Sequence, residues 1–370
     1  MSNILFILHL PPPVHGPSMV GGYIKDSNEI NAAFRCRYIN LGISRTVDEV
    51  GRKPLRKIGR YLSLLSRVFG QLIAFRPELC YISLSVGDSG FYKDVPVVLL
   101  TRLFGVKRLY HLHNKGVKLR SEKCYNDWLY RLVFHNAEVI LLSEYLYGDI
   151  EKYVPTERLH YCANGIEDVD TSQFIGNRDE IQQLSAVNLL FLSNLIVSKG
   201  VFVLLDACKQ LLEKDIAFHC TLVGGEGDID TKLLNCKIEE LGLTDVVSYA
   251  GKQYGADKEM YFNRADIFVH PSFNDCFPLV LLEAMQHGLP IVSTLEGAIP
   301  EIVIDKVTGY LVRQEDAGAL SEKLEKLIQN PELRQKMGKA GRLNYETKYS
   351  LEKFEKRMLE IVEQLTGSSS

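Results

Sequence analysis

The sequence predicts two α/β domains, each built on a doubly wound parallel sheet. Short apolar runs alternate with longer amphipathic stretches along nearly the whole chain, as in parallel strands joined by helices through right-handed crossovers. This series restarts after the polar stretch 167–185, which lacks strong periodicity. The length of 370 residues also exceeds what one hydrophobic core usually supports.

The strand candidates fall in two series. In the first half they are 4–8, 37–41, 79–84, 108–113, 139–142 and 159–162. In the second half they are 188–192, 217–223, 246–250, 267–270, 291–293 and 310–312. Helical patterns separate most of them, so we expect an N-terminal domain over 1–175 and a C-terminal domain over 176–348. Ligands of such sheets bind beyond the carboxyl ends of the strands.

The last segment, 349–370, has the pattern of an amphipathic helix. Ser350 can cap it and Glu352 lies in its first turn, where an acid is favourable. Apolar residues follow at steps of three and four: Leu351, Phe354, Met358, Ile361 and Leu365. We expect this helix to pack back on the N-terminal domain.

Charge is nearly balanced overall but is distributed unevenly. The chain has 43 Lys and Arg against 46 Asp and Glu, which gives no reason to expect a nucleic-acid partner or disorder. Residues 1–180 carry 23 basic and 19 acidic residues, and the remainder carries 20 (43 − 23) and 27 (46 − 19). The halves therefore differ in sign, +4 against −7, and we expect them to meet different partners.

The cysteines and the first residues bear on location. The eight Cys include no C-x-x-C and no zinc-like spacing with His, which predicts free thiols in a reducing compartment. Residues 1–10 lack a basic stretch of the kind that opens a secretion signal and run directly into Pro11. We expect a cytoplasmic protein.

Residues 269–285 give the most informative pattern for chemistry. A strand ends at His270, a polar loop follows, and a helix begins near Pro278. The free N–H groups at the start of this helix, together with the helix dipole, make an anion site. Glu283 lies five residues into this helix, roughly 7–8 Å along its axis, where it can accept hydrogen bonds from a diol. Asp275 precedes the helix and is expected on the other side of the anion. Alternatively, Asp275 caps the helix and Glu283 is a solvated helix residue.

Lys199 follows the first strand of the second half. It can reach a diphosphate and supply charge to a leaving group, or it can be an ordinary solvated lysine. The Gly-rich strand end 222–227 departs from the dinucleotide-binding pattern and gives only weak support for such a cofactor.

Two strand ends in the first half carry further candidates. Gly16 follows Pro11–Pro13 and permits close approach of backbone to a ligand, although a rigid surface turn explains it equally well. His111 and His113 lie at the end of another strand, where histidine can hydrogen-bond or transfer protons. A structural role is favoured for His111, and both roles stay open for His113.

Taken together, these segments resemble the retaining glycosyltransferases of family four, also called glycosyl transferases group 1. That family has the GT-B fold of two facing Rossmann-like domains with a C-terminal crossover helix. The resemblance runs from the Gly16 loop and the strand ending at His113 through 162–166 and 193–200. It continues through 275–283 and from His287 to Gly309.

The resemblance implies roles for particular residues. Glu283 matches the second acid of the family's E-x7-E motif, which binds the nucleotide ribose, and Asp275 matches the first, which contacts the donor sugar. Lys199 matches a phosphate-binding lysine, Gly16 a loop that closes on the diphosphate, and His113 a histidine near the donor sugar. Backbone contacts are implied for Phe277, Pro278 and Leu279 with sugar and diphosphate, and for Gly251 and Lys252 with the base.

Two departures from the family pattern stand out. The first acid is usually Glu and here is the shorter Asp275, and Asn194 stands where many members have a phosphate-binding Arg. Asn lacks the charge and the two-pronged geometry of Arg. Either Lys199 and the helix dipole suffice, or Arg264 or Lys252 compensates.

The resemblance implies metal-independent transfer of a hexose or related sugar from a nucleoside-diphosphate sugar to an acceptor hydroxyl, with retention and without a cofactor. Polysaccharide or glycolipid synthesis at the cell surface would fit. A glycosidase is disfavoured, because its two carboxylates must flank the scissile bond. A sugar-nucleotide epimerase of the same fold and a catalytically silent nucleotide-sugar-binding protein remain alternatives.

The basic segment 51–76 bears on the acceptor. No acid occurs in it, and one helical stripe is apolar: Leu55, Ile58, Leu62, Leu65, Phe69 and Leu72. Basic residues cluster on the other face, namely Lys53, Arg56, Lys57, Arg60 and Arg67, and Arg52 adds to the local excess. This predicts either a core-packed helix with a solvated basic face or a helix that docks on an anionic inner leaflet carrying a lipid-linked acceptor.

Overall fold

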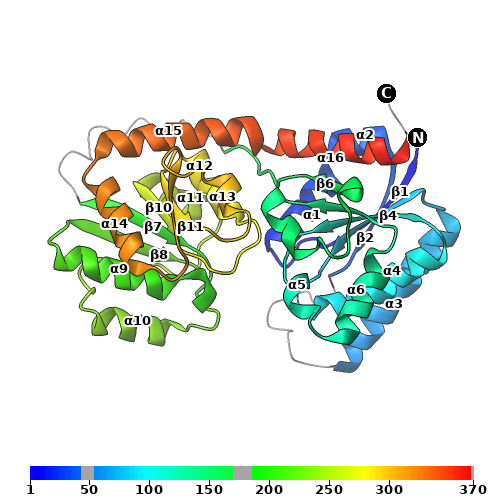
Figure 1. Ribbon diagram of the computed structural model, residues 1–370, viewed down its shortest axis with the longest axis horizontal. Helices are drawn as coiled ribbons and strands as arrows, with labels where there is room; N and C mark the ends of the chain where they lie inside the picture. Colours follow the sequence, from blue (N-terminus) through cyan, green and yellow to red (C-terminus); the bar gives the residue numbers. More distant parts are fainter. Residues whose placement is uncertain (43–53, 88, 170–185, 368–370) are drawn as a thin grey trace. The chain divides into compact units, whose positions relative to one another are not determined.

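The computed structural model describes residues 1–42, 54–87, 89–169 and 186–367, with side chains omitted at 54–57. The chain forms two compact units, one of Met1–Gly165 with Leu351–Ser370 and the other of Ile166–Ser350. The chain first passes between them at Gly165–Ile166, before the expected boundary at residue 175, which lies outside the described residues. Each unit is a doubly wound parallel α/β structure, as predicted (Figure 1).

The first unit is built on a six-stranded parallel sheet in the order β2-β1-β3-β4-β5-β6. Its strands are β1 (Asn3–Leu8), β2 (Arg35–Asn40), β3 (Leu79–Leu84), β4 (Lys107–Leu112), β5 (Glu138–Leu141) and β6 (Leu159–Tyr161). Its α-helices are α1 (Gly16–Asp26), α2 (Asn28–Ala33), α3 (Pro54–Ala74), α4 (Gly90–Leu103), α5 (Val117–Arg120), α6 (Cys124–Phe134) and α16 (Leu351–Thr366). Two 3-10 turns, Glu144–Asp149 and Thr156–Arg158, precede β6.

The C-terminal helix α16 completes the core of this first unit. Its apolar positions Phe354, Met358 and Val362 are buried in one cluster with Ile4 and Phe6 of β1. At roughly 1.5–3 kcal/mol for each large apolar side chain removed from water, this face stabilises the unit substantially.

The second unit has its own six-stranded parallel sheet in the order β12-β11-β10-β7-β8-β9. Its strands are β7 (Val187–Leu192), β8 (Phe218–Val223), β9 (Val247–Tyr249), β10 (Ile267–His270), β11 (Ile291–Thr294) and β12 (Gly309–Val312). Its α-helices are α9 (Val201–Glu213), α10 (Thr231–Glu240), α11 (Gly255–Arg264), α12 (Leu279–Gln286), α13 (Ile299–Ile302), α14 (Ala317–Ile328) and α15 (Pro331–Lys348). A 3-10 turn, Val197–Lys199, precedes α9.

The strand order of the second unit determines where a ligand is expected. The chain builds outward from β7 to β8 and β9, then returns to place β10 on the other side of β7. The strand order therefore reverses between β7 and β10, and ligands of doubly wound sheets bind at the carboxyl ends of the strands at such a point.

Helix α3 differs from the prediction for segment 51–76. Its buried side chains are Leu64, Val68 and Leu72, whereas Ile58 and Leu62 of the predicted stripe are 55% and 59% exposed. Phe69 is also exposed, because most of the predicted stripe lies on the side of α3 that faces away from the sheet. The interpretation of this stripe as core-packed is therefore wrong for Ile58, Leu62 and Phe69. Arg52 and Lys53 lie outside the described residues, as do the side chains of Leu55, Arg56 and Lys57.

Candidate functional site

Lys199 and Asp275 meet at the carboxyl ends of β7 and β10. Lys199 Nζ lies 2.7 Å from Asp275 Oδ2, and the two side chains are only 21% and 13% exposed. The buried ring of His270, the last residue of β10, donates from Nε2 to the same oxygen at 2.9 Å. The backbone N–H of Asp275 donates to Glu296 at 3.0 Å. This is a preformed ionic cluster at the reversal point of the sheet.

Two glycines let the loops that carry this cluster approach one another. Gly200 has a positive φ of 79°, and a Cβ built on it would lie 2.1 Å from the carbonyl oxygen of Pro271. Gly224, after β8, has φ 158°, and a Cβ there would lie 1.8 Å from the carbonyl oxygen of Ser193. Larger residues at either position would separate the strand ends, so both glycines help to bring Lys199 and Asp275 together.

The neighbours of Asp275 control its charge. Burial opposes ionisation of the carboxyl, but the hydrogen bond and charge of His270, together with the charge of Lys199, outweigh burial and lower its pKa. Asp275 does not cap α12, because Pro278 occupies the cap position and offers no side-chain hydrogen bond. The first turn of α12 therefore keeps the positive end of the helix dipole beside the cluster.

Glu283 forms a second ion pair within the same unit. Its Oε1 accepts a hydrogen bond from Lys258 Nζ at 2.8 Å, across from α12 to α11. The side chains are 24% and 22% exposed, so Glu283 is not the solvated residue of the alternative interpretation. Burial raises the pKa of Glu283, and the charge of Lys258 opposes that rise.

A further set of contacts holds the Lys258 end of this pair. Lys258 Nζ also lies 3.9 Å from Glu259 Oε1. Glu259 Oε2 accepts from His287 Nε2 at 2.7 Å, and the other ring nitrogen of His287 lies 2.9 Å from Asn263 Oδ1. These contacts connect α11 to the end of α12.

Lys252, rather than Arg264, lies close to Asn194. A Cβ built on Gly225 would lie 3.4 Å from Asn194 Oδ1 and 3.2 Å from Lys252 Cδ, so both side chains border this glycine. The Lys252 ammonium lies 5.0 Å above the ring of Tyr254. Lys252 therefore places a positive charge near the position where Asn194 lacks one.

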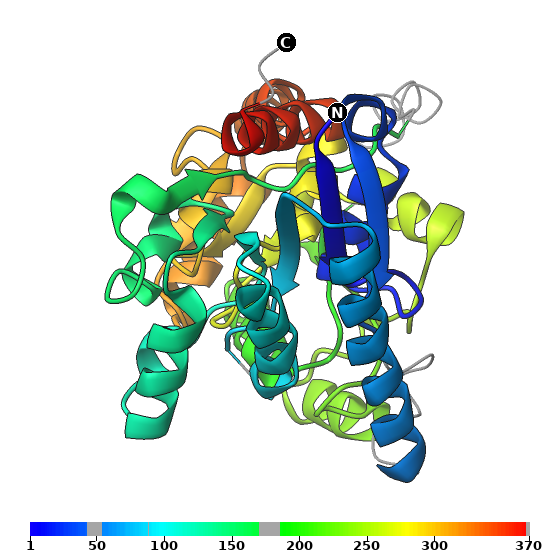
Figure 2. The ribbon, with the colours of Figure 1, turned by 90° about the vertical axis from the view of Figure 1, so that its right-hand side faces the viewer.

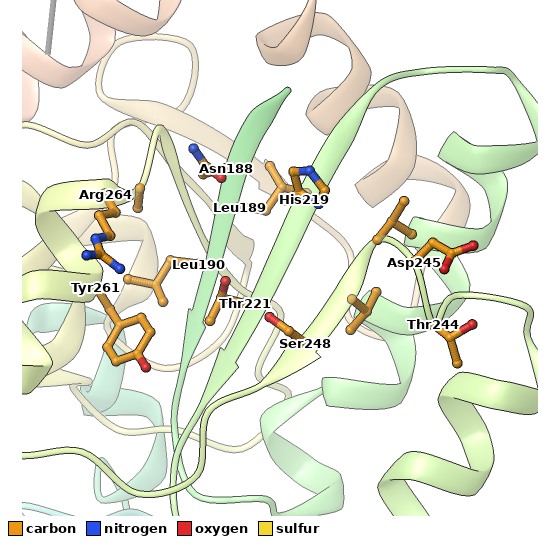
Figure 3. A pocket seen from close by; sticks show the side chains of 13 residues that line it. Asn188, Leu189, Leu190, His219, Thr221, Thr244, Asp245, Ser248, Tyr261 and Arg264 are labelled. Atoms are coloured by element: carbon orange, nitrogen blue, oxygen red, sulfur yellow. The ribbon is translucent and has the colours of Figure 1, made fainter. Parts of the chain in front are cut away.

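Arg264 lines a separate hollow at the amino ends of the strands (Figure 3). This hollow holds about 330 Å³ and is bordered by Asn188, His219 and Ser248, among others. Asn188 and Asn194 lie at opposite ends of β7, which at about 3.3 Å per residue is roughly 20 Å. Arg264 is thus too far away to replace the arginine that Asn194 lacks.

Among the described residues, no group of three or more His, Cys, Asp or Glu side chains is placed to hold a metal ion. In the sequence Asp228-Ile229-Asp230, both carboxylates accept hydrogen bonds from backbone N–H groups. Asp228 accepts from the N–H of Val197 at 2.8 Å, and Asp230 caps α10 by accepting from Leu233 at 2.7 Å.

In the first unit, His113 lies just after β4 within a group of histidines. His111 is structural: its Nδ1 lies 2.5 Å from the Tyr81 hydroxyl in the core. The rings of His111 and His113 are 4.1 Å apart, and those of His9 and His15 are 6.0 Å apart. Burial, with smaller effects of His9 and His15, lowers the pKa of His113 to about 3, so its imidazole is neutral at physiological pH.

Gly16 is the first residue of α1, after His15, which caps the helix by accepting from Ser18 N at 3.3 Å. A Cβ built on Gly16 would meet no atom within 4 Å. Among the described residues, no neighbouring atom therefore requires glycine at this exposed position.

Among the predicted residues of the second unit, the structure joins Lys199 to Asp275 and places Lys252 beside Asn194. Phe277 and Pro278 are buried and Leu279 opens α12, so this segment offers mainly backbone to a ligand. Gly251 has φ 69°, and its carbonyl oxygen accepts a hydrogen bond from the N–H of Gly224 at 2.9 Å.

Sequence reasoning missed His270 and Lys258. His270 had one usable signal, its position at the end of a strand directly before the acidic loop. Lys258 had none, because a lysine in the polar helix 255–264 is unremarkable until the fold brings it to Glu283.

Comparison with known proteins identifies this region. Residues 179–344 match the family model described as glycosyl transferases group 1. Over these residues the chain is similar to the group 1 glycosyltransferases. The predicted resemblance is confirmed, and the matched range lies within the second unit, Ile166–Ser350.

Relatives and solved structures agree with this assignment. The amylovoran biosynthesis glycosyltransferase AmsK of Erwinia amylovora is 30% identical over 217 residues, covering 57% of this chain and 52% of AmsK. The chain thus spans about half the length of the curated relatives it matches. HepE of Anabaena, solved with UDP, has a TM-score of 0.76 at 17% identity and covers 98% of this chain and 100% of its own.

The sucrose-phosphate synthase of Thermosynechococcus elongatus has a TM-score of 0.74 at 18% identity, covering 100% of both chains. These structural likenesses establish the GT-B fold of two doubly wound domains.

Proposed function

We propose that this protein is a retaining glycosyltransferase that moves a hexose or related sugar from a nucleoside diphosphate to an acceptor hydroxyl. The observation that carries the proposal is the Lys199–Asp275 pair at the reversal point of the second sheet, beside the positive end of α12. A cation and a helix N-terminus together suit a diphosphate leaving group. The acceptor belongs to cell-surface polysaccharide or glycolipid synthesis.

The reaction follows from the charges at this cluster. The bond between the sugar's anomeric carbon and the diphosphate oxygen breaks, and both electrons leave with the diphosphate. Lys199 and the first turn of α12 stabilise this growing negative charge. The acceptor oxygen attacks from the same face, and its proton passes to the departing phosphate. Asp275, kept ionised, holds Lys199 in place and accepts hydrogen bonds from the sugar.

The other predicted residues surround the donor in this proposal. Glu283 receives the ribose hydroxyls, and the backbone of Gly251 and Lys252 borders the base. Lys252 supplies the charge that Asn194 lacks, and the Phe277–Leu279 backbone contacts sugar and phosphate. For the first unit we propose that the Gly16 backbone can bind a diphosphate and that neutral His113 can hydrogen-bond a sugar. No metal takes part, so EDTA should leave turnover unchanged.

Two findings on related proteins support the donor and acceptor classes. HepE has been solved with UDP and with UDP-glucose. AmsK is described as an amylovoran biosynthesis enzyme, and CapM of Staphylococcus aureus, 27% identical over 161 residues, as a capsular polysaccharide biosynthesis glycosyltransferase.

The test is product analysis with a panel of UDP-, GDP- and ADP-sugars, each with and without sugar and lipid-linked acceptors. We expect transfer with retained anomeric configuration, or slow hydrolysis when the acceptor is absent. An epimerised donor would identify an epimerase instead. Binding without any turnover would identify a silent binding protein, whereas hydrolysis or transfer that disappears in Glu283→Ala would exclude one.

We also propose that α3 and the end of α4 dock on an anionic membrane that carries the acceptor. Ile58, Leu62 and Phe69 of α3 are exposed, Phe69 contacts Phe104, and Leu103 beside it is 78% exposed. Figure 2 shows α3 and α4 running alongside one another. These residues form the apolar patch. Arg60 and Arg67 lie on α3 and no acid occurs between 51 and 77, which suits anionic lipid.

Vesicle flotation tests this surface. Leu62→Ser with Phe69→Ser should lower binding to phosphatidylglycerol-containing vesicles by roughly tenfold or more, since burial of each such side chain contributes about 1.5–3 kcal/mol. Leu212→Ser, at an exposed position of α9, is the matched control. Equal binding of both variants, or a concentration-dependent dimer that the double variant abolishes, would overturn membrane docking. In the described residues, no helix is long and apolar enough to cross a membrane.

A further inference from the structure

We propose that Lys258 is a positioning residue that keeps the carboxylate of Glu283 ionised and oriented for two ribose hydroxyls. The inference rests on the ribose-binding role proposed above for Glu283. It adds a residue on another helix, α11, to which neither the sequence pattern nor the proposed reaction assigns a part.

The geometry places one cation against one oxygen of the carboxylate. Lys258 Nζ donates to Glu283 Oε1 at 2.8 Å, and both side chains are about three-quarters buried. The same ammonium lies 3.9 Å from Glu259, which is itself bonded to His287. A lysine held between two acids keeps a fixed position, so it can fix the rotation of the Glu283 carboxylate.

The charged groups that act on Glu283 come from α11 and from the end of α12. Burial raises its pKa, Lys258 opposes this rise most strongly, Glu259 adds to it, and His287 opposes it weakly. Without Lys258, the buried carboxyl of Glu283 would face Glu259, and it would stay protonated up to a higher pH. A protonated carboxyl carries its own O–H, so it is a poorer acceptor for two hydroxyl donors.

The experiment measures nucleotide affinity against pH in matched variants. The probes are UDP, GDP and ADP, of which the tightest binder is followed by calorimetry from pH 6 to 9. Each variant is compared with the wild type at the same pH, so that ionisation of the phosphate itself cancels. Lys258→Met removes the charge and keeps the stem, Lys258→Arg keeps the charge, and Glu283→Gln removes the proposed ribose acceptor.

For Lys258→Met we expect affinity about tenfold below wild type near pH 6.5, recovering to within about twofold by pH 9 as Glu283 ionises. Lys258→Arg should restore the wild-type profile. Glu283→Gln should be weak at every pH, with no recovery. A purely structural role of Lys258 would give a loss independent of pH, and that result, or no loss at all, would overturn the inference.

The two proposals fail differently. If Glu283→Gln binds the nucleotide as well as wild type, the ribose site itself is misplaced and the proposed function loses that contact. If Glu283→Gln is weak while Lys258→Met matches wild type at all pH values, only the role of Lys258 is wrong. Thermal melts without nucleotide confirm that each variant is folded.

Discussion

The second unit contains two lysine–carboxylate pairs of nearly equal length that differ in their surroundings. Lys199–Asp275 measures 2.7 Å and Lys258–Glu283 measures 2.8 Å, and all four side chains are largely buried. Asp275 has a second donor in His270, and its pKa is lowered. Glu283 has a lysine shared with another acid, and its pKa is raised.

The difference suggests a division of work along one nucleotide sugar. In the proposed function, the first pair stands at the helix N-terminus and gives a diphosphate a fixed positive site. The second pair lies deeper along α12, where the proposal has the Glu283 carboxylate accept hydrogen bonds from ribose and depend on Lys258 for its charge. Variants that break the pairs separately should therefore have separate effects.

The largest expected effect comes from Lys199→Ala. Removing one charged donor from a developing anion costs roughly 100- to 1,000-fold in turnover. Steady-state kinetics with the preferred donor should show this loss, while Lys209→Ala, an exposed lysine of α9, should retain wild-type rates. Near-normal turnover of a folded Lys199→Ala variant would remove the phosphate role from this pair.

The next effect concerns stability and sharpens the contrast between the two acids. Because the folded state lowers the pKa of Asp275, its ionised form stabilises the fold above its unfolded pKa of about 3.9. This contribution is lost as pH falls through the lower folded value. Asp275→Asn should therefore lower stability by about 1.5–3 kcal/mol between pH 5 and 8, and the difference should shrink below pH 4.

Chemical denaturation at several pH values checks this prediction. Asp206→Asn, at an exposed position of α9, is the matched control and should change little. A difference between Asp275→Asn and wild type that grows as the solution is acidified would contradict the assigned charge state.

The smallest effect is expected at Lys252. Because its ammonium is exposed, an ion pair with phosphate contributes about 0.2–1 kcal/mol, so Lys252→Met should weaken nucleotide binding by at most about fivefold. Arg264→Met, in the hollow of Figure 3, should leave the affinity unchanged. A larger loss of nucleotide affinity in Arg264→Met than in Lys252→Met would instead make Arg264 the residue that replaces the arginine missing at Asn194.

Sequence periodicity was sufficient to predict both sheets, because parallel strands buried on both faces leave short continuous apolar runs between amphipathic helices. Strand ends also pointed to Lys199 and Asp275, and the helix that follows the second of these strand ends pointed to Glu283; the roles of these residues stay predictions. Sequence periodicity could not pair them, because Lys258 and Glu283 lie on different helices and only packing brings them together.

The face of α3 was mispredicted for a related reason. Ile58, Leu62 and Phe69 repeat as a core stripe does, yet Leu64, Val68 and Leu72 form the buried side. Apolar spacing identifies a stripe on a helix, but the neighbouring elements decide which side is covered.

The central claim is that the two lysine–carboxylate pairs bind different parts of one nucleotide. It is tested most directly by measuring how two variants of the protein bind fragments of that nucleotide. Calorimetry would follow the preferred nucleoside diphosphate, its 2′-deoxy form and the bare nucleoside in Lys199→Ala and Glu283→Gln. We predict that Lys199→Ala loses the preference for the diphosphate over the nucleoside and keeps that for ribose over deoxyribose, and that Glu283→Gln does the reverse. Equal loss of both preferences in both variants, or loss of neither, would contradict the account.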